Sequence, residues 1–307
     1  MPKSYAYFEG NYVPLEDAKI SVMTHAFMYG TACFEGIRAY YSPEENQLFV
    51  FRMKEHFERL VNSCKILQIK PVLSVDGMCE VTLEALRRSE FREDVYIRPI
   101  AYKSSKAIGV KLVGLDDDFL VFGVPFGDYL DVNRGIRVQV STWRHLEDNI
   151  IPPRAKVNGA YVNAALAKSE ALQNGYDEAI FLSGDGHLSE GSAENLFLVK
   201  CGKLVTTPST EDILEGITRN TIIELAKDEL GIETVERRID RTELYTTDEC
   251  FLCGTGAQIS PVIEVDHRPV GTGEVGPITR KLQELYNDVV HGRVARYRKW
   301  CAAVYND

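Results

Sequence analysis

The chain has 307 residues, which is enough for one or two domains, and its 45% hydrophobic and 26% charged residues are an ordinary balance for a folded protein. A formal net charge of −10 argues against a nucleic-acid or anionic-membrane partner, because both would repel an acidic surface that lacks a basic patch. There is no run of eighteen apolar residues and no apolar run behind a basic start, so we expect a cytoplasmic protein.

The seven cysteines are odd in number and irregular in spacing, which is not typical of a disulfide framework. Cys250 and Cys253 have the C-x-x-C spacing of zinc and redox sites. In a strand, however, residues three apart point to opposite faces, so the two sulfurs would not converge. We therefore expect two small buried residues and no metal, with a metal or redox site as the alternative that metal analysis would test.

The first part of the chain combines a helix with strands, which favours an α+β or α/β fold. Between Lys54 and Leu67, apolar residues recur at three- and four-residue spacing, which predicts an amphipathic helix with Arg59 on its flank. Residues 96–100 and 119–124 are rich in aromatic and β-branched side chains and predict strands. We expect these elements to form a small N-terminal α/β domain, residues 1–125.

Residues 126–135 carry turn formers without a clear period, which predicts an interdomain linker. A larger C-terminal, cofactor-binding domain is expected at residues 136–307. Its expected elements are a strand at 136–143, a helix at 161–173 closed by Asn174-Gly175, strands at 179–182 and 196–199, a hairpin through Cys201-Gly202 and a helix starting near Thr218.

Three segments of this second domain suggest ligand chemistry. In Gly216 to Leu225 a glycine precedes a helix, whose free N–H groups would bind phosphate, although Thr218 could equally be an N-cap of its own helix. The turn Gly254 to Ala257 allows close approach to an anion, or is only a tight turn. Glu190 and Glu194 interrupt a strand-forming region and, taken alone, would be solvated loop acids.

Taken together, several segments resemble the class IV aminotransferase family, the fold type IV pyridoxal-phosphate enzymes that share the D-amino-acid aminotransferase-like fold. Within it the chain is similar to the branched-chain amino acid aminotransferases. The segments run in family order over nearly the full length. They are His25 to Gly30, Phe34 to Arg38, Tyr96 to Pro99, Lys156 with Tyr161, Ser189 to Gly191, Glu194 to Phe197, Gly216 to Arg219 and Gly254-Thr255.

The resemblance implies roles for the cofactor-binding residues. Lys156 would form the Schiff base with the aldehyde of pyridoxal 5'-phosphate, which only a primary amine can do. Glu190 would face the pyridine nitrogen, and Tyr161 would hydrogen-bond the phenolic oxygen of the ring. Glu194 would have a structural or supporting role. The phosphate would be bound by Arg59, Ile217, Thr218 and Thr255.

The same resemblance implies a substrate-binding set. Tyr96 and Arg98, two apart on one strand, would share a face near the substrate carboxylate, which the N–H groups of Gly256 and Ala257 would also meet. Aromatic residues would line the branched side chain, with Gly36 leaving room beside the ring, and Arg98 or Tyr29 would take the distal carboxylate of 2-oxoglutarate. These aromatic residues are Tyr29, Phe34 and Tyr129. Many relatives have Gly-Thr-Ala-Ala-Glu where this chain has Gly-Thr-Gly-Ala-Gln at 254–258, and this departure leaves the fine substrate preference open.

The implied reaction is transamination between L-leucine, L-isoleucine or L-valine and 2-oxoglutarate, giving branched-chain 2-oxo acids and L-glutamate. The alternatives within the fold are D-amino-acid aminotransferase, R-selective amine aminotransferase and aminodeoxychorismate lyase. A non-catalytic cofactor-binding protein is the alternative from another class, against which the retained Lys156 argues. The resemblance also implies two α/β domains with the cofactor in the cleft between them. It further implies a homodimer or larger even assembly, with Tyr29 a candidate for the neighbouring site.

Overall fold

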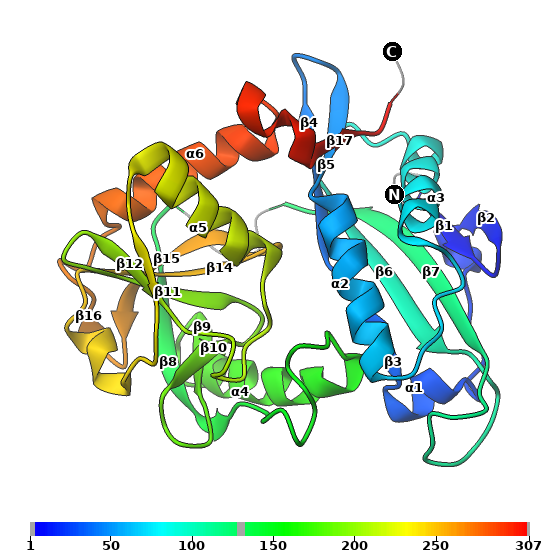
Figure 1. Ribbon diagram of the computed structural model, residues 1–307, viewed down its shortest axis with the longest axis horizontal. Helices are drawn as coiled ribbons and strands as arrows, with labels where there is room; N and C mark the ends of the chain where they lie inside the picture. The colour runs from blue at the N-terminus through cyan, green and yellow to red at the C-terminus, as the bar shows by residue number, and fades with distance from the viewer. Residues whose placement is uncertain (1–3, 128–132, 306–307) are drawn as a thin grey trace. The chain divides into compact units, whose positions relative to one another are not determined.

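The computed structural model describes residues 4–127 and 133–305 (Figure 1). The chain forms two compact units, the first of Met1–Gly127, Ala155–Gly159 and Asp288–Asp307, and the second of Asp128–Arg154 and Ala160–Asn287. Residues 155–159 and 288–307, which the sequence analysis assigns to the C-terminal domain, therefore belong to the first unit. The domain limits at residues 125 and 135 stay a prediction.

The first unit contains one sheet, in which every pairing among the described strands is antiparallel, and two long helices. Its strands are β1 (Tyr5–Phe8), β2 (Asn11–Pro14), β3 (Ala32–Phe34), β4 (Ile37–Ser42), β5 (Gln47–Phe51), β6 (Val95–Lys103), β7 (Asp117–Pro125) and β17 (Cys301–Ala303). Its helices are α1 (His25–Tyr29), α2 (Met53–Ile66) and α3 (Val75–Ser89), with 3-10 turns at Leu15–Asp17 and Ala295–Trp300.

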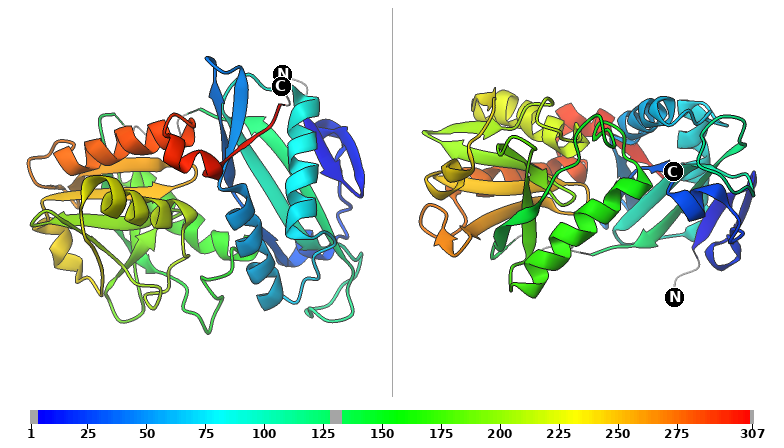
Figure 2. Two further views of the ribbon diagram at one scale, coloured as in Figure 1. Left: turned by 45° about the horizontal axis from the view of Figure 1, so that its top comes forward. Right: turned by 90° about the horizontal axis from the view of Figure 1, so that it is seen from below.

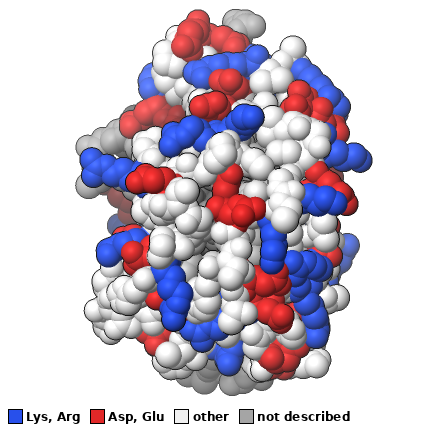
Figure 3. Space-filling model, turned by 90° about the vertical axis from the view of Figure 1, so that its left-hand side faces the viewer, with Lys and Arg blue, Asp and Glu red and all other residues white. Residues whose placement is uncertain are grey.

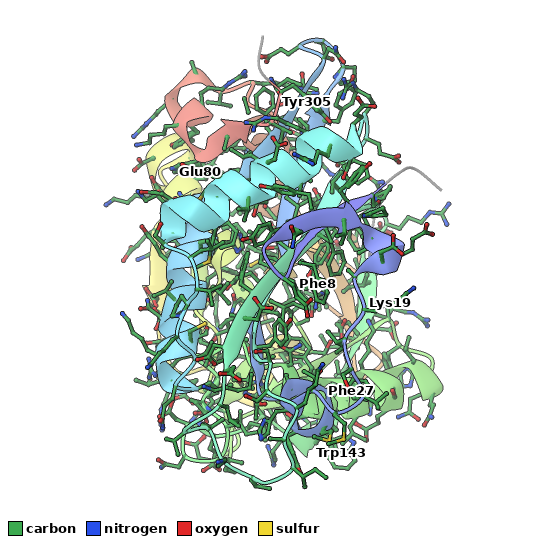
Figure 4. All side chains as sticks on the ribbon, turned by 90° about the vertical axis from the view of Figure 1, so that its right-hand side faces the viewer. Phe8, Lys19, Phe27, Glu80, Trp143 and Tyr305 are labelled. Atoms are coloured by element: carbon green, nitrogen blue, oxygen red, sulfur yellow. The ribbon has the colours of Figure 1, made fainter. Side chains whose placement is uncertain are left out.

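The sheet of the first unit is built around the antiparallel pair β6 and β7, which runs in register from Val95 opposite Pro125 to Lys103 opposite Asp117. Within the described residues the strand order is β17-β5-β4-β6-β7-β1-β2, and β3 also pairs with β6. The C-terminal strand β17 pairs with β5, which is why the end of the chain belongs to this unit. Helix α3 packs against β1 and β7 (Figure 4).

Helix α2 follows the amphipathic pattern of its sequence. The predicted helix at 54–67 is found at Met53–Ile66. Its apolar side chains Phe57, Leu60 and Cys64 are buried, as three- and four-residue spacing requires for a stripe facing a core. The predicted strands at 96–100 and 119–124 are found within β6 and β7. These three predictions are confirmed.

The second unit contains a larger sheet and three helices. Its strands are β8 (Ile136–Arg144), β9 (Glu178–Leu182), β10 (Leu188–Gly191), β11 (Asn195–Lys200), β12 (Lys203–Thr206), β13 (Thr234–Glu236), β14 (Glu249–Gly254), β15 (Gln258–Val265) and β16 (Arg268–Pro269). Its helices are α4 (Tyr161–Gln173), α5 (Ile217–Leu230) and most of α6 (Pro277–Val290), with a 3-10 turn at Arg241–Tyr245. A further 3-10 turn, Asn158–Ala160, precedes α4.

The sheet of the second unit has the order β10-β9-β8-β15-β14-β11-β12-β13 within the described residues. Period-two alternation divides its side chains between two faces. Ile180 and Leu182 join an apolar core contributed by most of the strands, whereas Ala179 and Phe181 pack with residues of α4. Helix α4 thus contacts β8 and β9, and α5 contacts β14 at another part of the sheet (Figure 2).

The local predictions for this unit are confirmed. Strand β8 covers the predicted 136–143, α4 covers 161–173, and Gly175 after it has a left-handed φ of 83°. The hairpin between β11 and β12 turns at Cys201 and Gly202, both with positive φ, as a type I′ turn requires. The structure adds strands that the sequence analysis did not name, among them β15 and the short edge strand β13.

Cys250 and Cys253 are the two buried strand residues that their sequence pattern predicts. Cys250 and Cys253 are free, lie on β14 and are fully buried, and burial raises the pKa of both thiols. No helix among the described residues is long and apolar enough to cross a membrane. On the face drawn in Figure 3, basic and acidic side chains are interspersed rather than gathered by sign.

Candidate active site

Glu35 lies at the centre of a charged cluster in the first unit. Its side chain is fully buried, and its Oε1 and Oε2 accept hydrogen bonds from Nε and Nη2 of Arg59 at 2.8 and 2.7 Å. His56, one turn before Arg59 on α2, places Nδ1 2.8 Å from Oε2. Burial alone would raise the pKa of Glu35, but the Arg59 guanidinium and the hydrogen bonds from Arg59 and His56 lower it to about 2. Glu35 is therefore an ionised partner that orients Arg59.

Four predicted substrate residues lie together in the first unit. Nη2 of Arg98 donates to the hydroxyl of Tyr96 at 2.8 Å, and its guanidinium carbon lies 4.3 Å from the centre of the Phe34 ring. The hydroxyl of Tyr96 lies 2.4 Å from the position of a Cβ on Gly36, so it fills the room that this glycine leaves. The buried Nε of Arg98 has no hydrogen-bond partner in the described part of the chain. This arrangement suits a carboxylate ligand.

Lys156 is held through its backbone in the same unit. Its N–H donates to Oγ of Ser63 at 3.1 Å, and its carbonyl accepts from the N–H of Phe34 at 3.0 Å. The next residue, Val157, forms a β-bridge with Cys33. Nζ of Lys156 lies 5.1 Å from the centre of the Phe34 ring. The backbone contacts thus place the Lys156 amine beside the group formed by Phe34 and Arg98.

The other predicted aromatic residues are placed differently. Tyr29, the last residue of α1, is 37% exposed. Its ring packs on His25 at 4.7 Å, and its hydroxyl accepts from the N–H of Gly109 at 3.2 Å. Tyr129 lies outside the described residues. Tyr29 therefore contacts the loop around Gly109, and its predicted role in binding substrate stays a prediction.

In the second unit, Glu190 on β10 is held by several groups. Its Oε2 accepts from Nδ2 of Asn195 at 2.9 Å and from the N–H of Leu214 at 3.1 Å. Its Oε1 lies 3.4 Å from Nε2 of His145. Only 9% of Glu190 is exposed, so it is a strand residue in a defined network and not the solvated loop acid that the segment alone would suggest.

The start of α5 has the features of an anion site. Its N-cap is Gly216, with extended backbone and no side-chain cap, so Thr218 is not the N-cap that the sequence left as an alternative. The first N–H groups of the helix at Ile217 and Thr218 point along its positive end. The turn between β14 and β15 contains Thr255, Gly256 and Ala257, and space is open around Gly256.

Tyr161 and Glu194 complete the predicted set in the second unit. Tyr161 is half-buried and is the first residue of α4. Glu194 is only 4% exposed, and its carboxyl accepts from the N–H of Ala193 at 3.0 Å. Burial and the nearby Glu178 carboxylate raise the pKa of Glu194 to about 8. The raised pKa favours the protonated form of Glu194 at neutral pH, and its supporting role stays a prediction.

Several residues of these two networks were not predicted from the sequence. Glu35 and Asn195 lie inside the motif segments, so their positions were visible although their partners were not. His56 could have been found from its spacing of three residues before Arg59 on a helix. His145 and Ser63 carry no local signal, because their partners Glu190 and Lys156 are distant in sequence.

The residues present fit pyridoxal phosphate. The uncapped start of α5 offers N–H groups and a threonine hydroxyl to a phosphate. A buried carboxylate that is held in place by two N–H donors suits a protonated ring nitrogen. Lys156 offers the primary amine that an aldehyde requires.

Comparison with known proteins decides the family. The model of the family described as Amino-transferase class IV matches residues 32–265. The chain belongs to the class IV aminotransferase family. This class IV aminotransferase is 53% identical over 302 residues to the probable branched-chain-amino-acid aminotransferase of Aquifex aeolicus (strain VF5), covering 98% of this chain and 97% of that one.

Solved structures of related class IV aminotransferases have the same fold. The branched-chain aminotransferase of the archaeon Thermoproteus uzoniensis with norvaline is 42% identical, with a TM-score of 0.94 over 98% of this chain and 99% of that one. The branched-chain amino acid aminotransferase of Thermobaculum terrenum in its PLP-form, the holo-form, is 38% identical, with a TM-score of 0.94 over 99% of each chain. The predicted family, fold class, enzyme class and cofactor, pyridoxal phosphate, are confirmed.

Proposed function

We propose that the protein transfers amino groups between L-leucine, L-isoleucine or L-valine and 2-oxoglutarate, giving branched-chain 2-oxo acids and L-glutamate. The observation that carries the proposal is the pairing of Arg98 with Phe34 and Tyr96, next to the Lys156 amine. An arginine among aromatic rings suits both substrates, because the rings pack on an aliphatic side chain and the guanidinium binds a carboxylate. The named relatives in Aquifex and Thermoproteus support this substrate class.

Pyridoxal phosphate, when bound, supplies a ring that withdraws electrons from the reacting carbon of the amino acid. The chain's own residues hold this group and move protons. Lys156 supplies the amine that anchors the cofactor and moves a proton at its Nζ. Glu190 keeps the ring nitrogen protonated, and Tyr161 donates to the ring oxygen. The phosphate contacts are proposed for Arg59, Ile217, Thr218 and Thr255.

The proposed substrate contacts follow the environment of each residue. Tyr96 and Phe34 pack against the substrate side chain, and Arg98 takes the distal carboxylate of 2-oxoglutarate. Gly256 and Ala257 offer turn N–H groups to the other carboxylate, and Gly36 accommodates the Tyr96 hydroxyl. The proposed aromatic wall also includes Tyr29 and Tyr129.

We also propose that the protein works as a homodimer or larger even assembly. Large apolar side chains are exposed on the first unit, including Val22, Phe27, Ile108 and Val110, and association with a second copy would remove such side chains from water. Phe27 is labelled on α1 in Figure 4. Sedimentation of the purified protein would test the assembly. The cytoplasmic location stays a prediction from the sequence.

A donor panel tests the proposed function. L-leucine, D-alanine and R-1-phenylethylamine are supplied with 2-oxoglutarate, and glutamate formation is measured. We expect rapid turnover of L-leucine, a loss of about 10⁴-fold or more in Lys156→Ala, and no change in the surface variant Lys54→Ala. Turnover of D-alanine or the R-amine without L-leucine would replace the proposal by the corresponding enzyme of the same fold. A protein that stays colourless with added cofactor would contradict it entirely.

A further inference from the structure

Asn195 links two parts of the second unit that are given cofactor roles above. It is the first residue of β11 and only 5% of it is exposed. Its Nδ2 donates to Oε2 of Glu190 at 2.9 Å and to the carbonyl of Leu214 at 2.8 Å. Both acceptors surround one atom of the side-chain amide, which identifies that atom as the nitrogen. Each N–H of the Asn195 amide therefore serves a different segment.

Leu214 also bonds directly to the Glu190 carboxylate. The N–H of Leu214 donates to the same Oε2 of Glu190 at 3.1 Å, so Glu190, Asn195 and Leu214 form a ring of three hydrogen bonds. Oε2 of Glu190 has two donors, while Oε1 lies 3.4 Å from Nε2 of His145. A carboxylate with one oxygen held by two donors cannot rotate without breaking both bonds. The ring therefore sets the orientation of the Glu190 carboxylate.

Asn195 also contacts the segment that leads into α5. A Cβ on Gly216 would lie 2.0 Å from Oδ1 of Asn195. The backbone of this N-cap residue therefore packs directly against the side-chain amide of Asn195. Leu214 lies two residues before Gly216 and is tied to Asn195 through its carbonyl. Arg219, in the first turn, is held separately by the carbonyl of Thr207 at 3.0 Å and by Glu236 at 2.6 Å.

We propose that Asn195 is a positioning residue that fixes the Glu190 carboxylate relative to the start of α5, so that one amide aligns the groups for both ends of pyridoxal phosphate. The inference rests on the proposed function, because the cofactor roles of Glu190 and α5 are assigned there. Asn195 itself acts through Glu190, Leu214 and Gly216. Its loss should weaken cofactor binding by uncoupling the two groups, beyond any effect on folding.

The test is a double-mutant cycle on the affinity of the cofactor-free, full-length chain for pyridoxal 5'-phosphate, measured by quenching of intrinsic fluorescence. We expect Asn195→Ala to raise Kd about tenfold, as for loss of a hydrogen bond to a charged group. In the Glu190→Gln background the same change should raise Kd less, with a departure from additivity of about threefold or more. A second cycle with Thr218→Ala should show the same departure. Agreement with additivity within about twofold in both cycles would overturn the proposal.

Two variants separate positioning from folding. Asn195→Asp keeps the shape of the side chain but turns an acceptor toward Glu190 and the Leu214 carbonyl, so we expect at least the loss seen in Asn195→Ala. An unchanged Kd in Asn195→Asp contradicts the proposal. The exposed Asn174, which donates to Gln139 at 2.9 Å, gives the control Asn174→Ala, with unchanged Kd expected. A purely structural role would lower the thermal midpoint of the cofactor-free variants while both cycles stayed additive. A wild-type chain that takes up no cofactor would instead contradict the proposed function.

Discussion

Glu35 in the first unit and Glu194 in the second are both buried carboxyl groups, yet their pKa values move in opposite directions. Burial raises the pKa of each, because a charge is poorly solvated in the interior. At Glu35 the bidentate contact with Arg59 outweighs burial and lowers the pKa to about 2. At Glu194 the Glu178 carboxylate adds to the effect of burial, and the pKa rises to about 8.

The difference shows that the partner, and not the depth of burial, decides the charge of an interior carboxyl group. Lys168 could have neutralised Glu194, but its Nζ lies 2.6 Å from Oε2 of Glu178 and is engaged there. Glu194 keeps its proton and uses its carboxyl to accept from Ala193. Glu35 is held as an anion, which keeps the guanidinium of Arg59 in one orientation. The two units thus use a buried acid in two ways.

The largest expected effect is that of Glu35→Gln. The change leaves the Arg59 charge without its buried partner, so we expect a loss of about 3–5 kcal/mol in the free energy of unfolding. Urea denaturation at pH 7 measures it. The control is Glu45→Gln, whose partner Arg298 is a surface residue, with about 0–1 kcal/mol expected. If Glu35→Gln lowers the free energy of unfolding by less than about 1 kcal/mol, the ion pair with Arg59 does not stabilise the charge of Glu35.

The pH dependence of this effect has a definite sign. The pKa of Glu35 is lower in the folded chain than its ordinary value of 4.5, so its contribution is complete above that value. It is lost as pH falls from 4.5 toward 2, because the unfolded chain takes up the proton first. The difference between wild type and Glu35→Gln should therefore shrink over this range. A difference that stays constant down to pH 2.5 would contradict the assignment.

Glu194→Gln tests the other side of the comparison. The folded pKa of about 8 lies above the ordinary 4.5, so the unfolded chain releases this proton at lower pH. Stability from Glu194 is therefore complete below about pH 4.5 and is lost as pH rises toward 8, by at most about 1.4 kcal/mol per pH unit. Glutamine has nearly the shape of the neutral glutamic acid side chain but cannot release a proton in this pH range. Between pH 5 and 7 the free energy of unfolding, measured by urea denaturation, should fall with rising pH less steeply in Glu194→Gln than in the wild type. Equal slopes would count against a protonated Glu194.

A further prediction concerns Gly36 in the first unit, and the corresponding change in the second unit, at Gly256, follows it. In the first unit, Gly36→Ala would bring a Cβ to 2.4 Å from the hydroxyl of Tyr96. The ring must move, and its hydrogen bond with Arg98 should break. We expect a loss of about 1–3 kcal/mol in stability and a higher KM for 2-oxoglutarate. Unchanged stability and KM would show that Tyr96 moves without cost.

The smallest expected effect is that of Gly256→Ala in the second unit. No atom lies within 4 Å of the added Cβ, and Gly256 does not have positive φ. Alanine should raise stability by about 0.4–1 kcal/mol, because it restricts the unfolded chain. The same variant has the Gly-Thr-Ala-Ala sequence that the family resemblance leads us to expect, so KM values for leucine, isoleucine and valine would reveal any effect on preference. A destabilised protein would show that the turn needs its glycine.

The local elements could be predicted because their causes are local. Helix α2 follows from apolar spacing and the hairpin at Cys201-Gly202 from turn chemistry, and both lie where the pattern places them. The motif segments likewise predicted the family and, with it, the fold and the cofactor. The roles of the individual site residues stay predictions, which the variants above would test.

The partners of the site residues could not be predicted, because each pair joins distant parts of the chain. Ser63 holds the backbone of Lys156, 93 residues away, and Arg59 meets Glu35, 24 residues away. Such contacts depend on the path of the whole chain, and residue type alone does not reveal them.

By itself, therefore, the sequence determined the local elements, the chemical groups available and the family. Only the tertiary structure decided which of two buried acids is charged, because a pKa depends on the neighbours that folding brings together. It also decided that Asn195 lies between Glu190 and the start of α5.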